Sequence, residues 1–94
     1  MTDSEPAWKL YVLRCGDGTL YCGVTTDLER RLARHSAGTG ARYTRGRGPL
    51  LLAASWELGS RSAALKAEAA FKSLPRATKD RLVAADVPLP WLPS

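Results

Sequence analysis

Residues 8–24 read WKLYVLRCGDGTLYCGV, and this stretch decides the fold. Residues 8–15 and 19–24 are rich in β-branched and aromatic side chains, which favour strands. The Gly-Asp-Gly triplet at 16–18, which separates them, is typical of a hairpin turn. The sequence therefore predicts two antiparallel strands joined by a tight turn.

The length of this turn decides which side chains share a face of the sheet. A two-residue turn would place Tyr11 and Tyr21 on opposite faces. A three-residue turn, with Gly18 in a left-handed conformation, puts both tyrosines on one face. We predict the three-residue turn. It also places Cys15 and Cys22 on opposite faces, which precludes a disulfide between them.

A helix is predicted over residues 27–37. Thr26 and Glu29 have the spacing of a capping box, in which the Thr26 hydroxyl accepts a hydrogen bond from the Glu29 amide. Leu28 and Leu32 mark the core side of this helix. Arg31 and His35 lie four residues apart beside that stripe, so their side chains should point together.

The rest of the chain predicts one more strand and two more helices. Residues 38–48 are rich in glycine and arginine and should form a loop. Residues 50–57 form an apolar run of strand length, which we expect to be central and well covered. Ser60 should cap a helix over residues 61–74, and Pro75 should begin another that ends near Ala85. The predicted class is α+β, in the order strand-strand-helix-strand-helix-helix.

Composition places the chain among ordinary globular domains. Its 94 residues are 45% apolar and 24% charged, which suits a single domain. We assign that domain to residues 8–85, with a disordered lead at 1–7 and a proline-rich tail at 86–94. No apolar run could cross a bilayer, no signal peptide is evident, and the two cysteines suit reduced thiols, so a cytoplasmic protein is expected.

The positive charge of the chain, +5 overall, is concentrated in one segment. Six arginines and no acidic residue lie between positions 30 and 47: Arg30, Arg31, Arg34, Arg42, Arg45 and Arg47. Such a segment could simply be a solvated surface. It could also follow a nucleic-acid backbone, because the planar guanidinium group suits phosphate.

Glu68 stands out in the predicted second helix. It lies at helical spacing between Leu65 and Phe71, on the face expected to be buried. A buried carboxylate is costly unless it is paired or bound to a metal ion. Glu68 could be a core residue paired with an arginine, a residue at the edge of the apolar stripe, or a metal ligand.

The order of these motifs resembles the signature of the GIY-YIG nucleases. Lys9-Leu10-Tyr11 and Tyr21-Cys22-Gly23 match the two tyrosine triplets, and Arg31 follows ten residues after Tyr21. The chain is especially similar to the short, stand-alone bacterial members of the UPF0213 type. The matching stretches are LYCGVTTDLERRLARH (20–35), GARYTRGRGP (40–49) and AALKAE (63–68). The resemblance implies a three-stranded antiparallel sheet flanked by helices.

The resemblance also implies roles for individual residues and a divalent cation, Mg²⁺ or Mn²⁺. One tyrosine would help to deprotonate the attacking water, a side chain at the motif glycine would obstruct the site, and a histidine lies near the tyrosines in many members. The positions concerned are Tyr11, Tyr21, Gly23, the catalytic Arg31, His35 and the metal-binding Glu68. The reaction would be endonucleolytic hydrolysis of nucleic-acid phosphodiesters, with DNA as the expected substrate and repair as the expected setting.

The chain departs from the family pattern at four positions. Lys9 stands where the first motif has glycine, and Cys22 replaces an isoleucine. Val24 stands where some members have a lysine thought to assist the base. Asp80 is at about the distance of an asparagine that some members carry after the glutamate. Lys9 and Val24 therefore support a non-catalytic binding module as an alternative to the nuclease.

Further substrate contacts are expected in the basic loop. Besides Gly23, the candidates are Arg42, Tyr43, Thr44, Arg45 and Arg47, with Tyr43 stacking on a base. Each site residue also has a plainer interpretation: the tyrosines as strand aromatics, Arg31 as a surface cation, and His35 as a helix C-terminal cation. A third alternative is an adaptor domain that binds a protein partner through Trp91 and the proline tail.

Overall fold

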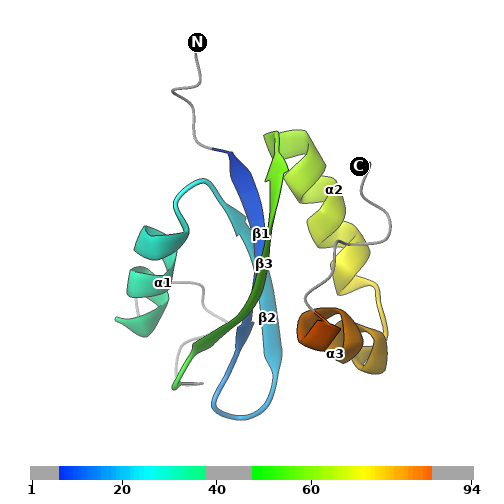
Figure 1. Ribbon diagram of the computed structural model, residues 1–94. Coiled ribbons are helices and arrows are strands. Elements are labelled where there is room, and N and C mark those ends of the chain that lie inside the picture. Colours follow the sequence, from blue (N-terminus) through cyan, green and yellow to red (C-terminus); the bar gives the residue numbers. More distant parts are fainter. Residues whose placement is uncertain (1–6, 38–47, 86–94) are drawn as a thin grey trace.

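The computed structural model describes residues 7–37 and 48–85 and confirms the α+β class and the order of elements (Figure 1). The elements are β1 (Trp8–Arg14), β2 (Leu20–Thr25), α1 (Leu28–Ser36), β3 (Leu51–Gly59), α2 (Arg61–Lys72) and α3 (Arg76–Ala85). The three strands form one antiparallel sheet in the order β2-β1-β3. The expected lead, except for Ala7, and the expected tail lie outside the described residues.

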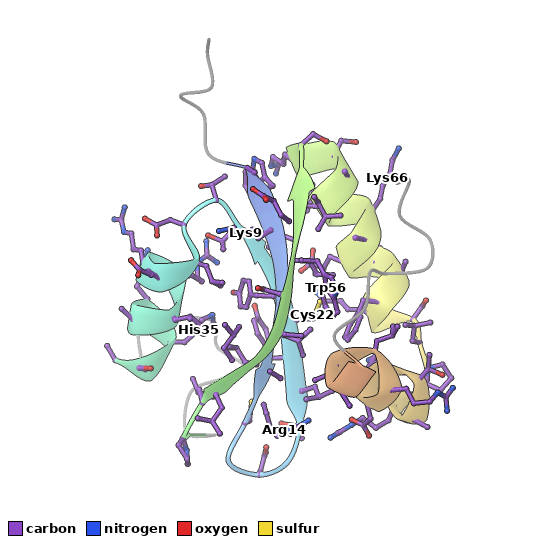
Figure 2. All side chains as sticks on the ribbon, in the orientation of Figure 1. Lys9, Arg14, Cys22, His35, Trp56 and Lys66 are labelled. Carbon is purple, nitrogen blue, oxygen red and sulfur yellow. The ribbon has the colours of Figure 1, made fainter. Side chains whose placement is uncertain are left out.

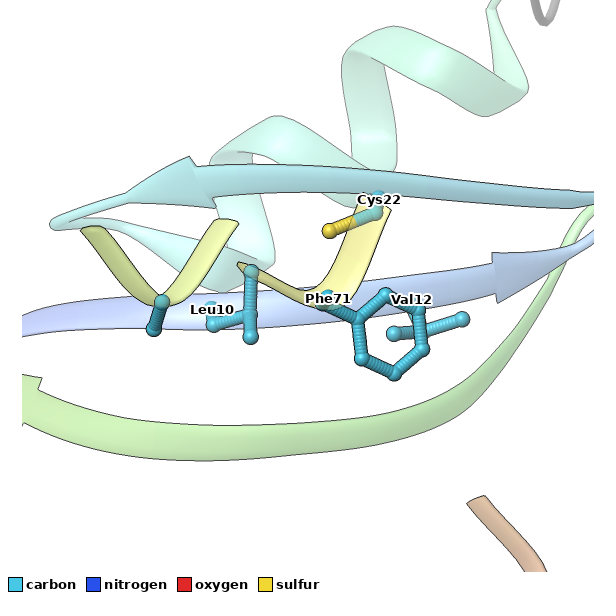
Figure 3. Packing of buried hydrophobic residues seen from close by; sticks show 5 residues of the cluster. Leu10, Val12, Cys22 and Phe71 are labelled. Atoms are coloured by element: carbon cyan, nitrogen blue, oxygen red, sulfur yellow. The ribbon is translucent and has the colours of Figure 1, made fainter. Parts of the chain in front are cut away.

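Helices lie on both sides of the sheet: α1 on one side, α2 and α3 on the other (Figure 1). The main core lies between the sheet and α2, where strand alternation turns Leu10, Val12 and Cys22 toward Ala67 and Phe71 (Figure 3). Complete burial of a large apolar side chain contributes about 1.5–3 kcal/mol. This layer therefore stabilises the sheet from one side. The opposite face of β1 and β2 is free to carry side chains that do not belong to this core. None of the helices described is long and apolar enough to cross a membrane.

The hairpin has the predicted three-residue turn. The Cys15 amide donates to the Thr19 carbonyl over 2.9 Å, and Gly18 has a φ of +87°, the left-handed value that favours glycine. The resulting register pairs Tyr11 with Gly23 and places Tyr21 on the same face as Tyr11. Both cysteines are free.

The expectation that the third strand is central was wrong. The strand β1 pairs with both neighbours, so β3 is an edge strand. Its first residues, Leu51 and Leu52, are 63% and 44% exposed. The better signal for the central strand was the run of four residues from Leu10 to Leu13, all of which are fully buried. A strand covered on both faces shows no alternation, whereas a merely apolar run can also lie at an edge.

The N-cap of α1 was also assigned wrongly. The helix begins one residue later than expected, and the carboxylate of Asp27 accepts a hydrogen bond from the Arg30 amide over 3.1 Å. Asp27 is itself held by the Thr25 hydroxyl, which accepts from the Asp27 amide over 3.1 Å. Aspartate is at least as good a cap as threonine, so the Thr26 capping box does not form. The predicted Ser60 cap of α2 is confirmed by its bond from the Ala63 amide.

The buried face of α2 differs from the predicted stripe. The buried residues are Ala64, Ala67 and Phe71, whereas Leu65 is exposed. Glu68 lies at the margin of this face with its side chain 20% exposed. Of the three interpretations considered for Glu68, its position therefore fits a residue at the edge of the stripe.

Candidate active site

Three aromatic rings meet between the sheet and α1. Tyr11 comes from the central strand and Tyr21 from the neighbouring strand. His35 comes from the last turn of α1 and points toward the sheet (Figure 2). The ring centroids of Tyr11 and Tyr21 are 6.3 Å apart, and His35 lies 5.9 Å from Tyr11 and 5.4 Å from Tyr21. The hairpin register and the position of His35 in α1 together bring the rings into mutual contact.

A buried hydrogen bond joins two of these rings. The Tyr11 hydroxyl lies 3.0 Å from Nε2 of His35. Tyr11 is fully buried and His35 is 3% exposed. Water competes poorly for polar groups in such surroundings, so this bond is stronger than the same bond would be at the surface.

Burial keeps the Tyr11–His35 pair uncharged at neutral pH, and the charge of Arg31 acts on both groups. Burial, followed by the nearby Tyr21, raises the pKa of Tyr11 to about 12, although the Arg31 guanidinium opposes this by its charge and a hydrogen bond. Burial, followed by the charge of Arg31, lowers the pKa of His35 below 6.5. The Tyr11 O–H can donate to Nε2 when the neutral imidazole carries its proton on Nδ1.

Gly23 makes room for the Tyr11 phenol. A Cβ atom built at Gly23 would lie 2.6 Å from the Tyr11 hydroxyl and 2.8 Å from Cζ of the same ring. Both distances are shorter than atoms tolerate without movement. The sequence resemblance marks this glycine as one whose side chain would obstruct the site, and the group that would be obstructed is Tyr11 itself.

Gly23→Ala is expected to destabilise the fold by about 1–3 kcal/mol, the usual range for an overpacked core, because the enclosed Tyr11 ring must move from its position. Urea unfolding of the parent and the variant measures this difference. Gly48→Ala is the matched control, since a Cβ there meets no atom within 4 Å. Equal losses in the two variants would contradict a specific fit between Gly23 and Tyr11.

The stability of the fold is expected to fall on mild acidification. The unfolded chain binds a proton at its only histidine near pH 6.5, whereas the folded chain does so at lower pH. Between the folded and the unfolded pKa of His35, the unfolded state therefore binds more protons. The free energy of unfolding decreases as the pH falls through this range. Urea unfolding at several pH values tests this. His35→Gln, which cannot titrate there, should show a flatter profile, and identical profiles would contradict the expectation.

An open depression adjoins Arg31 at the start of α1. Its volume is about 230 Å³, and its walls are polar. The lining residues are Thr25, Thr26, Asp27, Arg30, Arg31 and Arg34. Three arginines and one aspartate are among them, and the carboxylate of that aspartate caps the helix. Such a surface is suited to hold a phosphate group.

Glu68 does not belong to the cluster of Tyr11, Tyr21 and His35. It belongs to α2, on the opposite side of the sheet from α1 (Figure 1). Its carboxylate forms an ion pair with Lys72 over 3.3 Å, and its charge acts on the core thiol of Cys22. The structure thus gathers Tyr11, Tyr21, Arg31 and His35 in one place and puts Glu68 on a helix that packs against the other face.

Glu68 nonetheless has the chemistry of a magnesium ligand. Mg²⁺ prefers oxygen ligands, keeps several waters and often takes one or two carboxylates together with substrate phosphate. The Glu68 carboxylate is accessible to solvent, and the Lys72 side chain that pairs with it is 57% exposed and able to move away. The residues described contain no group of three or more histidine, cysteine, aspartate or glutamate side chains that could hold a metal.

The departures from the family pattern fall mostly outside the tyrosine cluster. Cys22 and Val24 point toward the α2 core, so neither faces the site. Asp80 pairs with Arg76 on the surface of α3. Lys9 is the exception: it lies two residues before Tyr11 in the same strand and pairs with Thr25, which puts it on the tyrosine face. Strand alternation could have revealed this cation from the sequence.

The remaining sequence-derived candidates cannot be placed. Six of them lie outside the described part of the chain, namely Arg42, Tyr43, Thr44, Arg45, Arg47 and Trp91. Their suggested contacts with nucleic acid or a protein partner therefore stay predictions.

Comparison with known proteins shows what this chain is similar to. A family model described as the GIY-YIG catalytic domain matches residues 7–81. A UPF0213 protein of Serratia liquefaciens is 52% identical over 83 residues, which cover 88% of this chain and 81% of that protein. A UPF0213 protein of Natronomonas pharaonis is 56% identical over 75 residues, covering 80% and 88% respectively.

Two solved structures share the fold. The solution NMR structure of a UPF0213 protein from Bacillus halodurans has 45% sequence identity and a TM-score of 0.55, with 83% of each chain covered. The solution NMR structure of a protein from E. faecalis has 41% identity and a TM-score of 0.57, with 90% of this chain and 91% of that one covered. With two motif tyrosines in contact, an arginine beside them and a family match over most of its length, this chain belongs to the GIY-YIG catalytic-domain family.

Proposed function

We propose that this protein is a metal-dependent endonuclease that hydrolyses DNA phosphodiester bonds with low sequence specificity. Family membership supports a nuclease. The observation that carries the proposal for this chain is the buried bond between the Tyr11 hydroxyl and Nε2 of His35, adjacent to the Arg31 guanidinium. A single domain of this size has little room for reading bases, so contacts should be made mostly to phosphates.

In the proposed reaction the Tyr11–His35 pair moves one proton. The raised pKa of Tyr11, about 12, means that a free phenolate is scarce at neutral pH. The Tyr11 oxygen instead accepts a proton from the attacking water as its own proton passes to Nε2 of the neutral His35. The water oxygen bonds to phosphorus, the bond to the leaving oxygen breaks, and that oxygen takes a proton from solvent. Such general base catalysis contributes about 10²- to 10⁴-fold in rate.

Arg31 would neutralise the negative charge that develops on the phosphoryl oxygens. Its charge acts on the Tyr11 hydroxyl, and Arg31 also lines the depression at the start of α1. A phosphate held there would lie next to the proton-accepting phenol. A divalent cation held by Glu68 would supply charge neutralisation at the scissile phosphate.

The two tyrosines then have different roles. Tyr11 is fully buried, whereas Tyr21 is only partly buried. Tyr21 is therefore the phenol better placed to touch the substrate phosphate, and the attacking water would come in past Tyr21 to reach the Tyr11 oxygen. Arg42, Arg45 and Arg47, which the sequence predicts to contact the substrate, would add further phosphate contacts.

One observation favours a second candidate, a non-catalytic nucleic-acid-binding module. Glu68 is paired with Lys72 on a helix that packs against the other face of the sheet. If that carboxylate stays apart from the tyrosine cluster when DNA is bound, the metal and the proton relay cannot act on one phosphate. The module would then keep the arginine surface and bind without cutting.

The experiment that tests the proposal uses single-stranded, duplex and branched DNA with Mg²⁺ or Mn²⁺. Cleavage by the parent, but not by Glu68→Ala or Arg31→Ala variants of unchanged thermal stability, supports the endonuclease. Salt-sensitive binding without cleavage of any substrate would replace the proposal with the binding module. Absence of binding would point to the adaptor.

A further inference from the structure

A second pocket lies between the edge strand β2 and the helices α2 and α3. Its volume is about 210 Å³. We call it the edge pocket, and its lining residues are Leu20, Tyr21, Cys22, Phe71, Lys72 and Lys79. It is separate from the arginine depression, with which it shares no lining residue.

The edge pocket combines an apolar floor with a cationic rim. The floor is formed by Leu20, Cys22 and Phe71, and the last two belong to the main core (Figure 3). The ammonium group of Lys79 lies 5.8 Å from the centre of the Phe71 ring, in a cation–π arrangement. Lys72 supplies the second cation. An uncharged apolar ligand would make no use of the positive charge at this rim.

The edge pocket also adjoins the proposed catalytic centre. Tyr21 belongs both to its wall and to the ring cluster with Tyr11 and His35. Glu68 lies beside it, since its carboxylate is the partner of Lys72 and acts on the Cys22 thiol together with Lys72 and Lys79. An extended ligand held in the pocket would therefore continue around β2 toward the tyrosines.

We propose that the edge pocket binds one unstacked nucleotide of a single-stranded segment, with the base on Leu20, Cys22 and Phe71 and the phosphate on Lys72 and Lys79. This ligand matches the observed chemistry because a nucleotide carries an apolar ring face and an anion at fixed separation. Bases stacked and paired in a duplex cannot enter such a pocket. The inference rests on the proposed function and narrows its substrate to DNA with a single-stranded segment beside the cleaved bond.

Lys72 would exchange partners when the nucleotide binds. In the free protein it pairs with Glu68 across one helical turn, an exposed type of pair that contributes little to stability. A phosphate at the rim competes with the carboxylate for this ammonium group. Binding therefore releases Glu68, and removal of the Glu68 charge should favour the phosphate.

The test measures binding without cleavage, in EDTA, with a short fluorescent single strand and the matching duplex. Lys72→Gln and Lys79→Gln are each expected to weaken single-strand binding several-fold and to lower the slope of log affinity against log salt by about 0.7. Lys66→Gln is the matched control, because Lys66 is an exposed lysine of α2 that does not line the pocket (Figure 2). Glu68→Gln should tighten binding more than Glu57→Gln does.

Amide NMR shifts locate the contact. Addition of the single strand should shift the signals of Leu20, Cys22 and Lys79, and addition of the duplex should shift them much less. Equal effects of Lys66→Gln and Lys79→Gln, or shifts confined to α1, would overturn the edge pocket as a nucleotide site. If the single strand binds in the edge pocket but is not hydrolysed under any condition, the proposed nuclease activity is refuted and the proposed nucleotide site is supported.

Discussion

Arg31→Ala is expected to lower the single-turnover rate of DNA cleavage by about 10²- to 10³-fold, the usual effect of removing one fixed group that stabilises transition-state charge. The reason is that Arg31 is the guanidinium next to the Tyr11 hydroxyl as well as part of the phosphate-sized depression. Rates measured with enzyme in excess separate this loss from weaker binding. The thermal midpoint should change little, because Arg31 is only partly buried.

Arg30→Ala is the matched control for this result. Arg30 is adjacent in the same helix and lines the same depression, but it is exposed, and it is Arg31 whose charge acts on Tyr11 and His35. Its loss should weaken DNA binding, most strongly at low salt, and leave the rate of bound substrate nearly unchanged. Similar rate losses in both variants would mean that Arg31 contributes only general positive charge.

Glu68→Gln is expected to reduce Mg²⁺-dependent cleavage by about a hundredfold or more, since a catalytic metal ion supplies several kcal/mol of charge stabilisation. The side chain keeps its shape and loses the charge that holds the cation. The fold should persist, because the pair with Lys72 spans one helical turn and its Lys72 side chain is 57% exposed, and helical pairs of this spacing contribute about 0.3–0.5 kcal/mol. Single-turnover rates and thermal unfolding measure the two effects.

Mn²⁺ provides a readout that does not depend on activity. Its paramagnetism should broaden the amide signals around Glu68 in the parent and leave them sharp in Glu68→Gln. Glu57→Gln, a change at an exposed glutamate of β3, should preserve both the broadening and the cleavage rate. Full activity of Glu68→Gln would remove Glu68 from the mechanism and leave it as a surface carboxylate.

The part of the site built by the hairpin could be predicted from the sequence. One local choice, the turn at Gly16-Asp17-Gly18, fixes the register, and the register places Tyr11 beside Gly23 and on the face of Tyr21. Helical spacing likewise predicted that Arg31 and His35 point together, and Arg31 does act on His35. These features follow from the two-residue period of a strand and the period of about four residues of a helix, and both periods can be read from the sequence.

Features that depend on how elements pack could not be predicted in this way. The edge position of β3 is set by β1 pairing with both neighbours, and an apolar composition does not report it. Helical periodicity gave Glu68 a position near the apolar stripe, but small residues such as Ala64 and Ala67 decide which side of α2 approaches the sheet. The clash that a Cβ atom at Gly23 would make with the Tyr11 hydroxyl can be seen only in the three-dimensional structure.

A double-mutant cycle on Tyr11→Phe and His35→Gln tests the proton relay most directly. The hydroxyl and the imidazole form one buried hydrogen bond, so they should act as a unit. Each single variant should lose about 10²-fold or more in single-turnover rate, and the double variant should be no slower than the slower single one. Independent losses that multiply in the double variant, or a Tyr11→Phe protein as fast as the parent, would contradict a relay through this pair.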